Sequence, residues 1–423
     1  MTELERVEIE GFKGLEYVEF EPTDINLITG RNNTGKTSFL EAVDLLFNPV
    51  NLTDFGDNLD SVIHVDFEHS EIRGKNGETE VEIALRKPSS AEAEKHFLEA
   101  TPVISGHRVS PTFGENNTES GEEFESTEAL LEKVGDVTDR AFRDILAQDG
   151  VANLREELLM VSTATDEYPC FLEKEASTAI MEEILNEVNR DLGEEVEIEA
   201  IDLLQRNGPV GRLKIDSRVI SIGFPPENSF LKRPENTDSA TYIKSVDLTE
   251  RIEQTDDEQD PIRIDDISDL LKEKEVVGNL KTLTLDYLVF EDENGEKDQI
   301  PYEFMGDGFK SMVGLLWELM DDEIEDQIVL IEEPENHMHP GYVREMVYFL
   351  IDLAREENVQ LFITTHDSDF INDFYTENLT DDEEAYLKDE FSLLRMEEDS
   401  AVVEDYETAR ENLKEHHLDL RGI

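Results

Sequence analysis

The sequence predicts an α/β protein in which a mixed sheet, flanked by helices, is assembled from the two ends of the chain. Three short, largely apolar segments, 25–28, 328–331 and 360–364, have the length and composition of buried strands. Helical spacing of apolar residues follows the first two, at 39–47 and 341–357. Apolar strands that alternate with helices are typical of a parallel sheet covered on both faces.

The N-terminal segment, residues 1–88, is expected to form one lobe of this fold. Its period-two and helical patterns predict, in order, strands at 4–9, 17–20 and 25–28, a helix at 39–47, and a hairpin with strands at 62–67 and 81–86 around a turn at 74–77. The helix is expected to end at Asn48-Pro49, because proline cannot continue it.

The middle of the chain, residues 89–277, is expected to be an inserted α+β domain. A loop at 88–128, helices at 128–160 and 174–192, and strands at 195–204, 211–223 and 241–248 are predicted, followed by an exposed acidic loop at 253–260. No heptad pattern is sustained, so we expect no long coiled-coil arm.

The C-terminal part is expected to return to the α/β pattern and to complete the sheet. The second lobe, residues 278–380, is predicted to contain strands at 283–290, 328–331 and 360–364 and helices at 309–320 and 341–357. The last segment, residues 381–423, is predicted to add a hairpin, with strands at 391–395 and 401–404, and a polar helix.

The charge balance is extreme, with 104 acidic against 37 basic residues and a formal net charge of −67. The 21 phenylalanines and clear periodicities argue against a disordered acidic chain. We expect a folded protein of a halophile, whose acidic surface serves solubility where salt screens charge repulsion.

Cellular location is predicted from what the sequence lacks. No segment resembles a leader sequence, and no apolar run approaches the ~18 residues of a membrane span. The single cysteine, Cys170, excludes an internal disulfide and is interpreted as an apolar filler. We therefore expect a cytoplasmic protein with no membrane partner.

The strongest motif is the pattern Gly-x-x-x-x-Gly-Lys-Thr, which lies between a predicted strand and a predicted helix. Glycines there allow backbone N–H groups to turn toward phosphate oxygens, while Lys36 reaches the β- and γ-phosphates and the Thr37 hydroxyl ligates Mg²⁺. The nucleotide-binding residues are expected to be Gly30, Arg31, Asn32, Asn33, Thr34, Gly35, Lys36, Thr37 and Ser38.

Two further strands are predicted to deliver polar side chains to the same edge of the sheet. Glu332 and Glu333 follow the apolar run 328–331, and open α/β sheets bind ligands at the carboxyl ends of their strands. We expect Glu332 to belong to the Mg²⁺ shell and Glu333 to activate water against the γ-phosphate. His366, after the strand 360–364, is interpreted as a sensor of the γ-phosphate.

Taken together, these motifs resemble the ABC-type P-loop ATPases of the SMC/RecF/OLD group, and within it the OLD-like AAA ATPases. The resemblance is carried by the glycine loop and, beyond it, by Ile9-Glu-Gly-Phe-Lys-Gly14, Met305-Gly-Asp-Gly-Phe-Lys310, Glu332-Glu-Pro-Glu-Asn-His-Met-His-Pro340 and Thr364-Thr-His-Asp367. It covers residues 1–88 and 278–375 well and the segment between them poorly.

The resemblance implies ATP and Mg²⁺ as ligands and catalysis by Lys36, Glu333 and His366. It also implies that Gly306, Asp307, Gly308 and Lys310 form a signature loop that caps the nucleotide of a second subunit, giving a homodimer through an ATP sandwich. Met305 stands where an ABC signature has serine. Asn336 would lie in the loop that communicates across the dimer.

The resemblance further implies that ATP switches engagement of DNA or of an effector in anti-phage defence or DNA repair. OLD nucleases carry a C-terminal TOPRIM domain of ~100 residues, an ordinary domain size, whereas only about 50 residues follow the His366 strand. We therefore expect any effector, such as a nuclease or a toxin, to be a separate protein.

Two other features of the sequence allow more than one interpretation. The pair His337 and His339 could ligate a metal, but no third ligand is apparent and the resemblance makes both ordinary members of the motif. One segment has few acidic residues, and its basic side chains could bind DNA or an acidic partner, or could instead form ion pairs with carboxylates of the same chain. Its basic residues are Arg206, Arg212, Lys214, Arg218, Lys232 and Arg233.

Two alternative functions differ from the leading one. An ABC transporter motor is disfavoured by the missing Leu-Ser-Gly-Gly-Gln signature, by the long insertion and by the absence of a membrane segment. A GTP-dependent switch is disfavoured because no Asn-Lys-x-Asp motif is present. Preference for ATP over GTP stays open at this point.

Overall fold

The computed structural model describes most of the chain. The described residues are 3–49, 51–52, 55, 61–77, 79–89, 91–92, 103–108, 133–138, 140–141, 144, 158–163, 167–171, 174–192, 196–204, 208–215, 218–223, 240–244, 261–273, 279–291, 294–320, 327–397 and 400–421. The chain divides into two compact units, the first made of 1–48, 71–82 and 236–423 and the second of 49–70 and 83–235.

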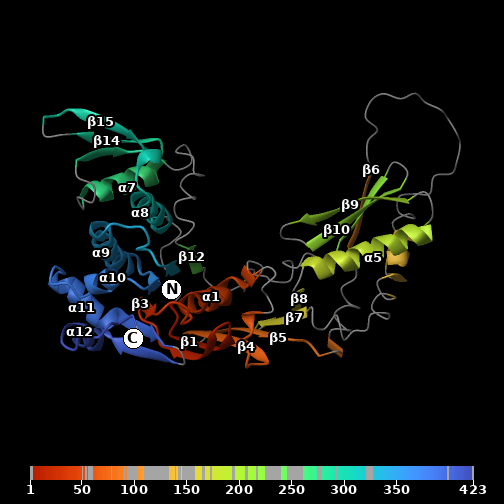
Figure 1. Cartoon of the computed structure of the whole chain (residues 1–423), viewed down its shortest axis with the longest axis horizontal. Coiled ribbons are helices and arrows are strands. Elements are labelled where there is room, and N and C mark those ends of the chain that lie inside the picture. Colours follow the sequence, from red (N-terminus) through yellow and green to blue (C-terminus); the bar gives the residue numbers. More distant parts are fainter. Residues whose placement is uncertain are drawn as a thin grey trace. The chain divides into compact units, whose positions relative to one another are not determined.

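The first unit is built on a six-stranded sheet to which both ends of the chain contribute. Its order is β12 (Ala240–Lys244), β16 (Ile328–Glu332), β17 (Gln360–Thr365), β3 (Ile25–Gly30), β18 (Phe391–Met396) and β19 (Ala401–Asp405). All neighbours are parallel except β18 and β19. The N-terminal strand β3 therefore lies between two C-terminal strands. In Figure 1, red N-terminal and blue C-terminal elements accordingly lie together in this unit. The architecture is therefore the α/β fold predicted from the sequence, a mixed sheet flanked by helices and assembled from both ends of the chain.

Helices cover both faces of this sheet, so even polar residues of its central strands, such as Asn26 and Thr364, are buried. All six residues of β3 and of β17 are buried. On one face, Phe362 packs against Phe39 of α1 (Lys36–Phe47), with ring centroids 6.3 Å apart. On the other, Ile331 and Ile363 join a core that includes Val347 of α9 (Pro340–Glu357).

A second, antiparallel sheet packs against the outer side of α1. It consists, in order, of β2 (Leu15–Phe20), β1 (Arg6–Phe12), β4 (His69–Asn76), β5 (Thr79–Arg86), β7 (Leu158–Thr163) and β8 (Glu167–Phe171). The end of β5, β7 and β8 are assigned to the second unit. Phe20 meets Phe39 edge to face at 6.1 Å. Helix α1 is therefore held between two layers, with its N-terminus fixed at the end of β3.

The predicted strand at 62–67 is wrong. Residues 61–67 form turns, in which the Phe67 amide donates to the His64 carbonyl, and the strand is β4, in register with β1 through Ile9 and Ile72. The turn of the hairpin lies at Gly77, whose φ of 57° suits glycine.

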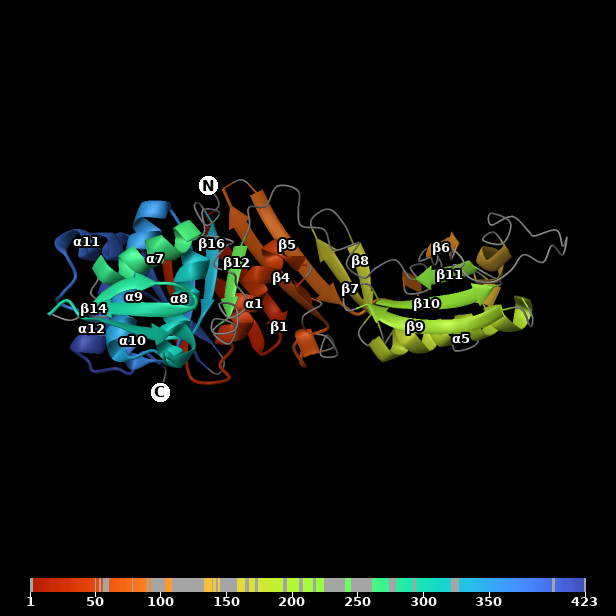
Figure 2. The ribbon, with the colours of Figure 1, turned by 90° about the horizontal axis from the view of Figure 1, so that it is seen from above.

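The second unit contains a four-stranded sheet with one long helix. The order is β6 (Val103–Arg108), β11 (Arg218–Gly223), β10 (Gly208–Ile215) and β9 (Val196–Leu204), and α5 (Lys174–Leu192) packs on β9 and β10, as Figure 2 shows. The predicted helix 174–192 and the predicted strand 195–204 are confirmed. The segment 211–223, predicted as one strand, instead contains β11 and most of β10, which pair antiparallel.

Elsewhere in the predicted insert the structure differs from the expectation. Strand β6 lies inside the segment predicted as a loop, and β7 replaces the end of the helix predicted to reach residue 160. Two elements of the stretch 89–277, β12 and α7 (Pro261–Glu273), belong to the first unit, because β12 pairs with β16. The acidic segment 253–260 lies outside the described residues.

The remaining elements complete the first unit. They are the sheet β13 (Leu280–Leu283), β14 (Tyr287–Glu291) and β15 (Lys297–Pro301), the 3₁₀ helix η4 (Tyr302–Phe304), and the helices α8 (Asp307–Leu319), α10 (Ser368–Asp373), α11 (Asp381–Glu390) and α12 (Tyr406–Lys414). Helix α8, the hairpin β18–β19 and the polar helix α12 are as predicted. Among the described residues, no helix is long and apolar enough to cross a bilayer.

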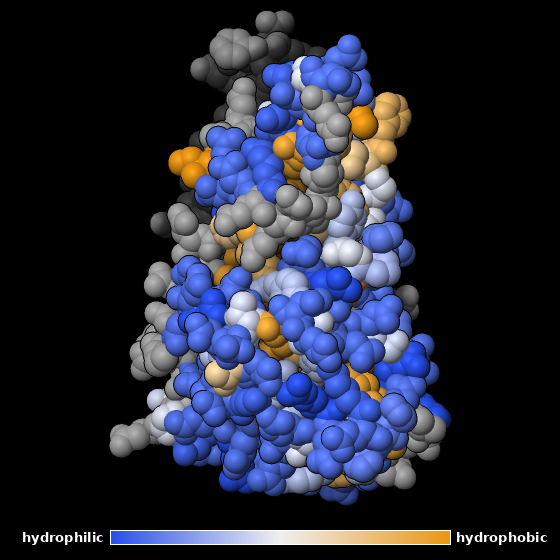
Figure 3. Space-filling model, turned by 90° about the vertical axis from the view of Figure 1, so that its left-hand side faces the viewer, coloured by the Kyte–Doolittle hydropathy of each residue, from blue (hydrophilic) through white to orange (hydrophobic). Residues whose placement is uncertain are grey.

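The surface is mainly hydrophilic on the face shown in Figure 3, with apolar residues in small, separate groups. Large hydrophobic side chains that are exposed among the described residues include Tyr17, Val65, Ile262, Ile300, Phe304, Val403 and Leu418. Hydrophilic residues on this face thus cover an apolar core.

Candidate active site

The glycine loop leaves the carboxyl end of β3 and enters α1 through two unusual backbone positions. Gly30 has a φ of 151°, and a Cβ atom there would lie 2.6 Å from the carbonyl oxygen of Met396. Gly35, directly before α1, has a φ of 95°. Residues that carry a side chain rarely adopt these backbone φ values. Glycine at both positions therefore allows the loop to turn tightly over the N-terminus of the helix.

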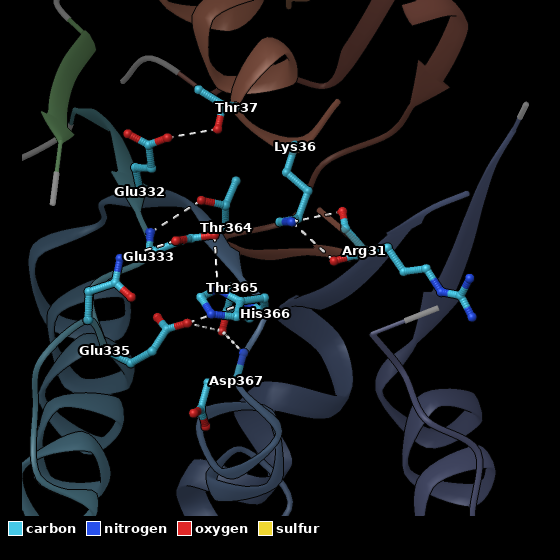
Figure 4. A network of polar contacts seen from close by, with 12 residues as sticks. Arg31, Lys36, Thr37, Glu332, Glu333, Glu335, Thr364, Thr365, His366 and Asp367 are labelled. Atoms are coloured by element: carbon cyan, nitrogen blue, oxygen red, sulfur yellow. Dashed lines mark hydrogen bonds and ion pairs between the residues drawn. The ribbon is translucent and has the colours of Figure 1, made fainter. Parts of the chain in front are cut away.

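Lys36 is the first residue of α1, and its side chain reaches back to the glycine loop. Its side chain is buried, and its Nζ atom donates hydrogen bonds to the carbonyl oxygens of Gly30 at 3.1 Å and Arg31 at 3.2 Å (Figure 4). Burial lowers the pKa of Lys36, while Glu333, Glu335 and Glu332 oppose that shift. The ammonium group is thus held against the backbone of the glycine loop, at the N-terminus of α1.

Thr37 and Glu332 meet across the site, although 295 positions separate them in the sequence. The Thr37 Oγ1 atom donates to Glu332 Oε1 at 2.7 Å (Figure 4). Hydroxyl and carboxylate oxygens are the ligands that Mg²⁺ prefers. The donor set therefore fits the magnesium site expected from the sequence.

Glu333 is held in place by its backbone and by two side chains. Its φ of 43° is unusual for a residue with a side chain, and its amide donates to the Thr364 carbonyl at 3.0 Å. Its carboxylate accepts from Asn336 Nδ2 at 3.1 Å, and His366 Nδ1 lies 3.0 Å from its other oxygen. The structure thus brings Glu333 and His366 together at the ends of β16 and β17.

A third carboxyl group, that of Glu335, lies beneath this pair. Its Oε1 atom accepts from Thr365 Oγ1 at 2.5 Å and from the His366 amide at 3.4 Å (Figure 4). Burial is the largest cause of a pKa of about 7 for Glu335. Sequence reasoning assigned no role to this residue; its place in Glu-Glu-Pro-Glu after a buried strand was the available signal.

The loop predicted to act as a signature lies at the start of α8. Gly306 caps the helix, and the amide groups of Phe309 and Lys310 donate to its carbonyl oxygen. Gly308 lies so close to the turn after β16 that a Cβ atom would be 2.1 Å from the His337 carbonyl oxygen. The Lys310 side chain is buried, with Nζ 6.0 Å from the ring centroid of Tyr302. This loop therefore packs on the turn that carries Glu333 and Asn336.

His337 and His339 lie beyond that turn. His337 has a φ of 65°, and His339 caps α9 by accepting a hydrogen bond from the Gly341 amide through Nδ1 at 3.1 Å. The capping role gives His339 a structural function at the start of a helix.

The C-terminal segment also approaches the glycine loop, which sequence reasoning missed. Thr29 Oγ1 donates to the Leu420 carbonyl oxygen at 2.7 Å. The hydrogen bond from Arg421 is the main cause of a lowered pKa for Asp419, and the charge of Arg31 contributes. No local pattern connects residues 391 positions apart.

The basic segment predicted as a contact surface is described only in part. Arg212 and Lys214 lie on β10 and Arg218 on β11. Arg206, Lys232 and Arg233 lie outside the described residues.

The chain is similar to a known family and to several known proteins. Residues 25–372 match the family model described as "AAA domain, putative AbiEii toxin, Type IV TA system". An uncharacterized protein of Methanocaldococcus jannaschii is 28% identical over 120 residues, which are 28% of this chain and all of that protein. The SMC head domain from Thermotoga maritima matches at 10% identity and a TM-score of 0.42, over 95% of this chain and 98% of that one. The Smc head domain derived from Pyrococcus furiosus, bound to the C-terminal domain of ScpA, matches at 11% identity and a TM-score of 0.41, over 99% and 100%.

Proposed function

The chain belongs to this AAA-domain family, a family of P-loop ATPase domains, and on that premise we propose that it binds ATP with Mg²⁺ and hydrolyses it. The observation that carries the proposal is the convergence of three strand ends. Lys36 follows the loop after β3, Glu332 ends β16 and Glu333 comes directly after it, and His366 follows β17. These three strands are neighbours and parallel in one sheet. The carboxyl ends of parallel strands are where open α/β sheets bind ligands.

Binding begins with the loop 30–38 at the N-terminus of α1. Backbone N–H groups at a helix start favour phosphate oxygens, and Lys36 would exchange its two carbonyl partners for the β- and γ-phosphates. Thr37 and Glu332 would hold the Mg²⁺ ion. When bound, that ion neutralises developing charge on the phosphates.

Hydrolysis needs a base that removes a proton from the attacking water. Glu333 is the best-placed candidate, because its carboxylate projects from the strand end and is oriented by Asn336. His366, 3.0 Å from the same carboxylate, would orient Glu333 and sense the γ-phosphate. Because these two side chains pair with each other, sensing would require ATP to separate them.

We also propose that ATP closes a homodimer. Gly306, Asp307, Gly308 and Lys310 at the start of α8 would cap the nucleotide of the second subunit, as the resemblance to OLD-like ATPases implies. Support comes from the position of this loop, which presents a helix N-terminus suited to anions. The contact of Gly308 with the turn after β16 would link closure to Glu333.

The dimer would act as a switch for another molecule in defence or repair. The family description names a toxin of a toxin–antitoxin system, which supports a defence role with a separate nuclease or toxin as effector.

DNA is the second candidate partner, through the basic segment that includes Arg212 and Lys214. Replacing both residues by glutamate should weaken retention on DNA in a salt-dependent binding assay; unchanged retention would assign these cations to internal pairing.

The proposed reaction is tested with two substitutions. Glu333→Gln should retain ATP binding and stop turnover, with an ATP-bound dimer accumulating on size exclusion. Lys36→Ala should abolish nucleotide binding, measured by equilibrium titration. Phosphate release from Glu333→Gln at the wild-type rate would remove Glu333 from the catalytic role.

Nucleotide choice is tested with the wild-type protein. Parallel phosphate-release assays with ATP and GTP should show faster turnover of ATP, because no guanine-reading motif is present. Preference for GTP would favour the regulatory-switch alternative.

A further inference from the structure

Glu335 is a buried carboxyl group in the active site that the proposed reaction does not use. Only 6% of the residue is exposed. Its Oε2 atom is buried and finds no hydrogen-bond partner among the described residues. A buried polar group without a partner costs free energy, so an acid retained here needs another reason than stability.

The hydrogen bonds of the other carboxyl oxygen of Glu335, Oε1, indicate why an acid lies at this position. Oε1 accepts one hydrogen bond from the Thr365 hydroxyl group and one from the His366 backbone amide. Both donors lie at the point where β17 ends and the chain turns toward α10. The His366 ring, on the same residue as the second donor, lies against Glu333.

Thr365 extends this arrangement to the following helix. The Thr365 hydroxyl group also accepts from the Asp367 amide at 3.0 Å. Asp367 in turn caps α10, because its side chain accepts from the amides of Asp369 and Phe370. Glu335 is therefore the fixed acceptor at one end of a short hydrogen-bonded path that contains His366.

We propose that Glu335 is a positioning residue for ATP hydrolysis, which holds the Thr365–His366 segment so that the His366 ring orients the Glu333 carboxylate. This inference rests on the proposed ATPase function. Glu335 does not touch the reacting atoms; it acts through the backbone of His366. A base misplaced by about 1 Å can lose ~100-fold in rate, so fixing this segment matters for turnover.

The path requires an acceptor at position 335, and it does not require a negative charge there. The raised pKa of Glu335 agrees with a group that is often neutral in the folded protein. Glutamine has an amide oxygen in the same place, which can accept both hydrogen bonds. Alanine removes the acceptor and leaves the Thr365 hydroxyl and the His366 amide without this partner.

The test therefore compares Glu335→Ala with Glu335→Gln in the full-length protein. Glu335→Ala should lower kcat by about tenfold or more and leave KM for ATP within about twofold, because phosphate binding depends on other residues. Glu335→Gln should retain kcat within about threefold. Loss of rate in both variants alike, or a proportional rise of KM in Glu335→Ala, would overturn the proposal.

Glu404→Ala is the matched control for the loss of a buried glutamate. Glu404, on β19, is 5% exposed and pairs with Arg395 at 3.0 Å and Asn412 at 2.9 Å. Its substitution should lower stability and leave kcat within about twofold. A loss of kcat as large as in Glu335→Ala would show that general destabilisation explains the effect.

A second measurement does not depend on turnover. The side-chain NMR signals of His366, assigned with His366→Gln, should shift in Glu335→Ala and stay in place in Glu335→Gln. Unshifted signals in Glu335→Ala would contradict the positioning role.

Glu333→Gln and Lys36→Ala are measured alongside. If the wild-type protein shows no ATP turnover, or if both variants retain it, the ATPase function proposed for this site fails; if both variants lose turnover and Glu335→Ala does not, only the present inference fails.

Discussion

At the residue scale, the buried carboxyl group of Glu335 ties the stability of the fold to pH. Its pKa is raised from 4.5 to about 7, mainly by burial. The charged groups around it are Glu333, which raises the pKa further, His366, which lowers it, and Lys36. A raised pKa means that the folded state binds the proton more tightly than the unfolded state does.

The sign of the effect follows from this difference. Below pH 4.5 both states are protonated, and the fold bears no cost for the charge. As the pH rises from 4.5 to about 7, the unfolded state loses its proton first, so the free energy of unfolding falls. Above about pH 7 the full cost is present.

Glu335→Gln should remove this dependence. Between pH 5.5 and 8, the free energy of unfolding of wild-type protein should fall by about 2 kcal/mol relative to that of Glu335→Gln. Urea unfolding of both proteins across this pH range measures the difference between their free energies of unfolding. The contributions of other titrating groups, which both proteins share, cancel in this difference. Parallel curves for the two proteins would mean that Glu335 titrates normally.

The sequence motifs predicted the placement of several residues of the candidate site, but they did not single out Glu335, whose burial depends on the fold. The sequence predicted that these residues lie at one edge of the sheet. Their strand ends share that edge, where Thr37 contacts Glu332 and Glu333 contacts His366. Glu335 could not be distinguished in the same way, because one acid among 104 acidic residues shows its burial only in three dimensions. The roles of all these residues in catalysis stay predictions until measured.

At the element scale, the N-terminus of α8 and the turn after β16 touch through Gly308. A Cβ atom there would lie 2.1 Å from the backbone oxygen of His337, and backbone cannot give way as a flexible side chain can. Gly308→Ala should therefore displace one element from the other and lower the melting temperature by several degrees. Thermal unfolding followed by circular dichroism measures this shift.

Gly306→Ala is the control for stability. Nothing lies within 4 Å of a Cβ atom at Gly306, and its φ of −68° suits alanine. Its melting temperature should match that of wild-type protein within about one degree. Equal destabilisation by both substitutions would show that helix capping, and not the contact with His337, makes glycine necessary.

The predictability of an element depended on how it is buried. Strands β3, β16 and β17 are covered on both faces, so their short, largely apolar segments indicated buried strands. The segment 62–67 was misread as a strand because it contains apolar residues, yet Val65 is 90% exposed. Strand β4 has few apolar residues and is defined by its pairing with β1, a long-range property.

At the scale of the whole molecule, the two ends of the chain form one sheet. Strand β3 pairs with β17 and β18, so residues near position 27 contact residues near 363 and 393. The order of motifs made this assembly predictable. The division into units was harder to foresee, because β12 returns to the main sheet through a parallel pairing with β16 that local patterns do not encode.

The net charge of −67 predicts that stability depends strongly on salt. Repulsion among surface carboxylates opposes the compact state, and its range shrinks from about 10 Å at 0.1 M salt to about 3 Å at 1 M. The melting temperature should therefore rise steeply between 0.1 M and 2 M KCl. A thermal unfolding series in KCl measures it, with sucrose as the uncharged control, because sucrose favours burial without screening charge. If screening dominates, KCl should stabilise at concentrations at which sucrose has little effect. A melting temperature that is independent of KCl would contradict both the repulsion argument and the halophilic origin inferred from composition.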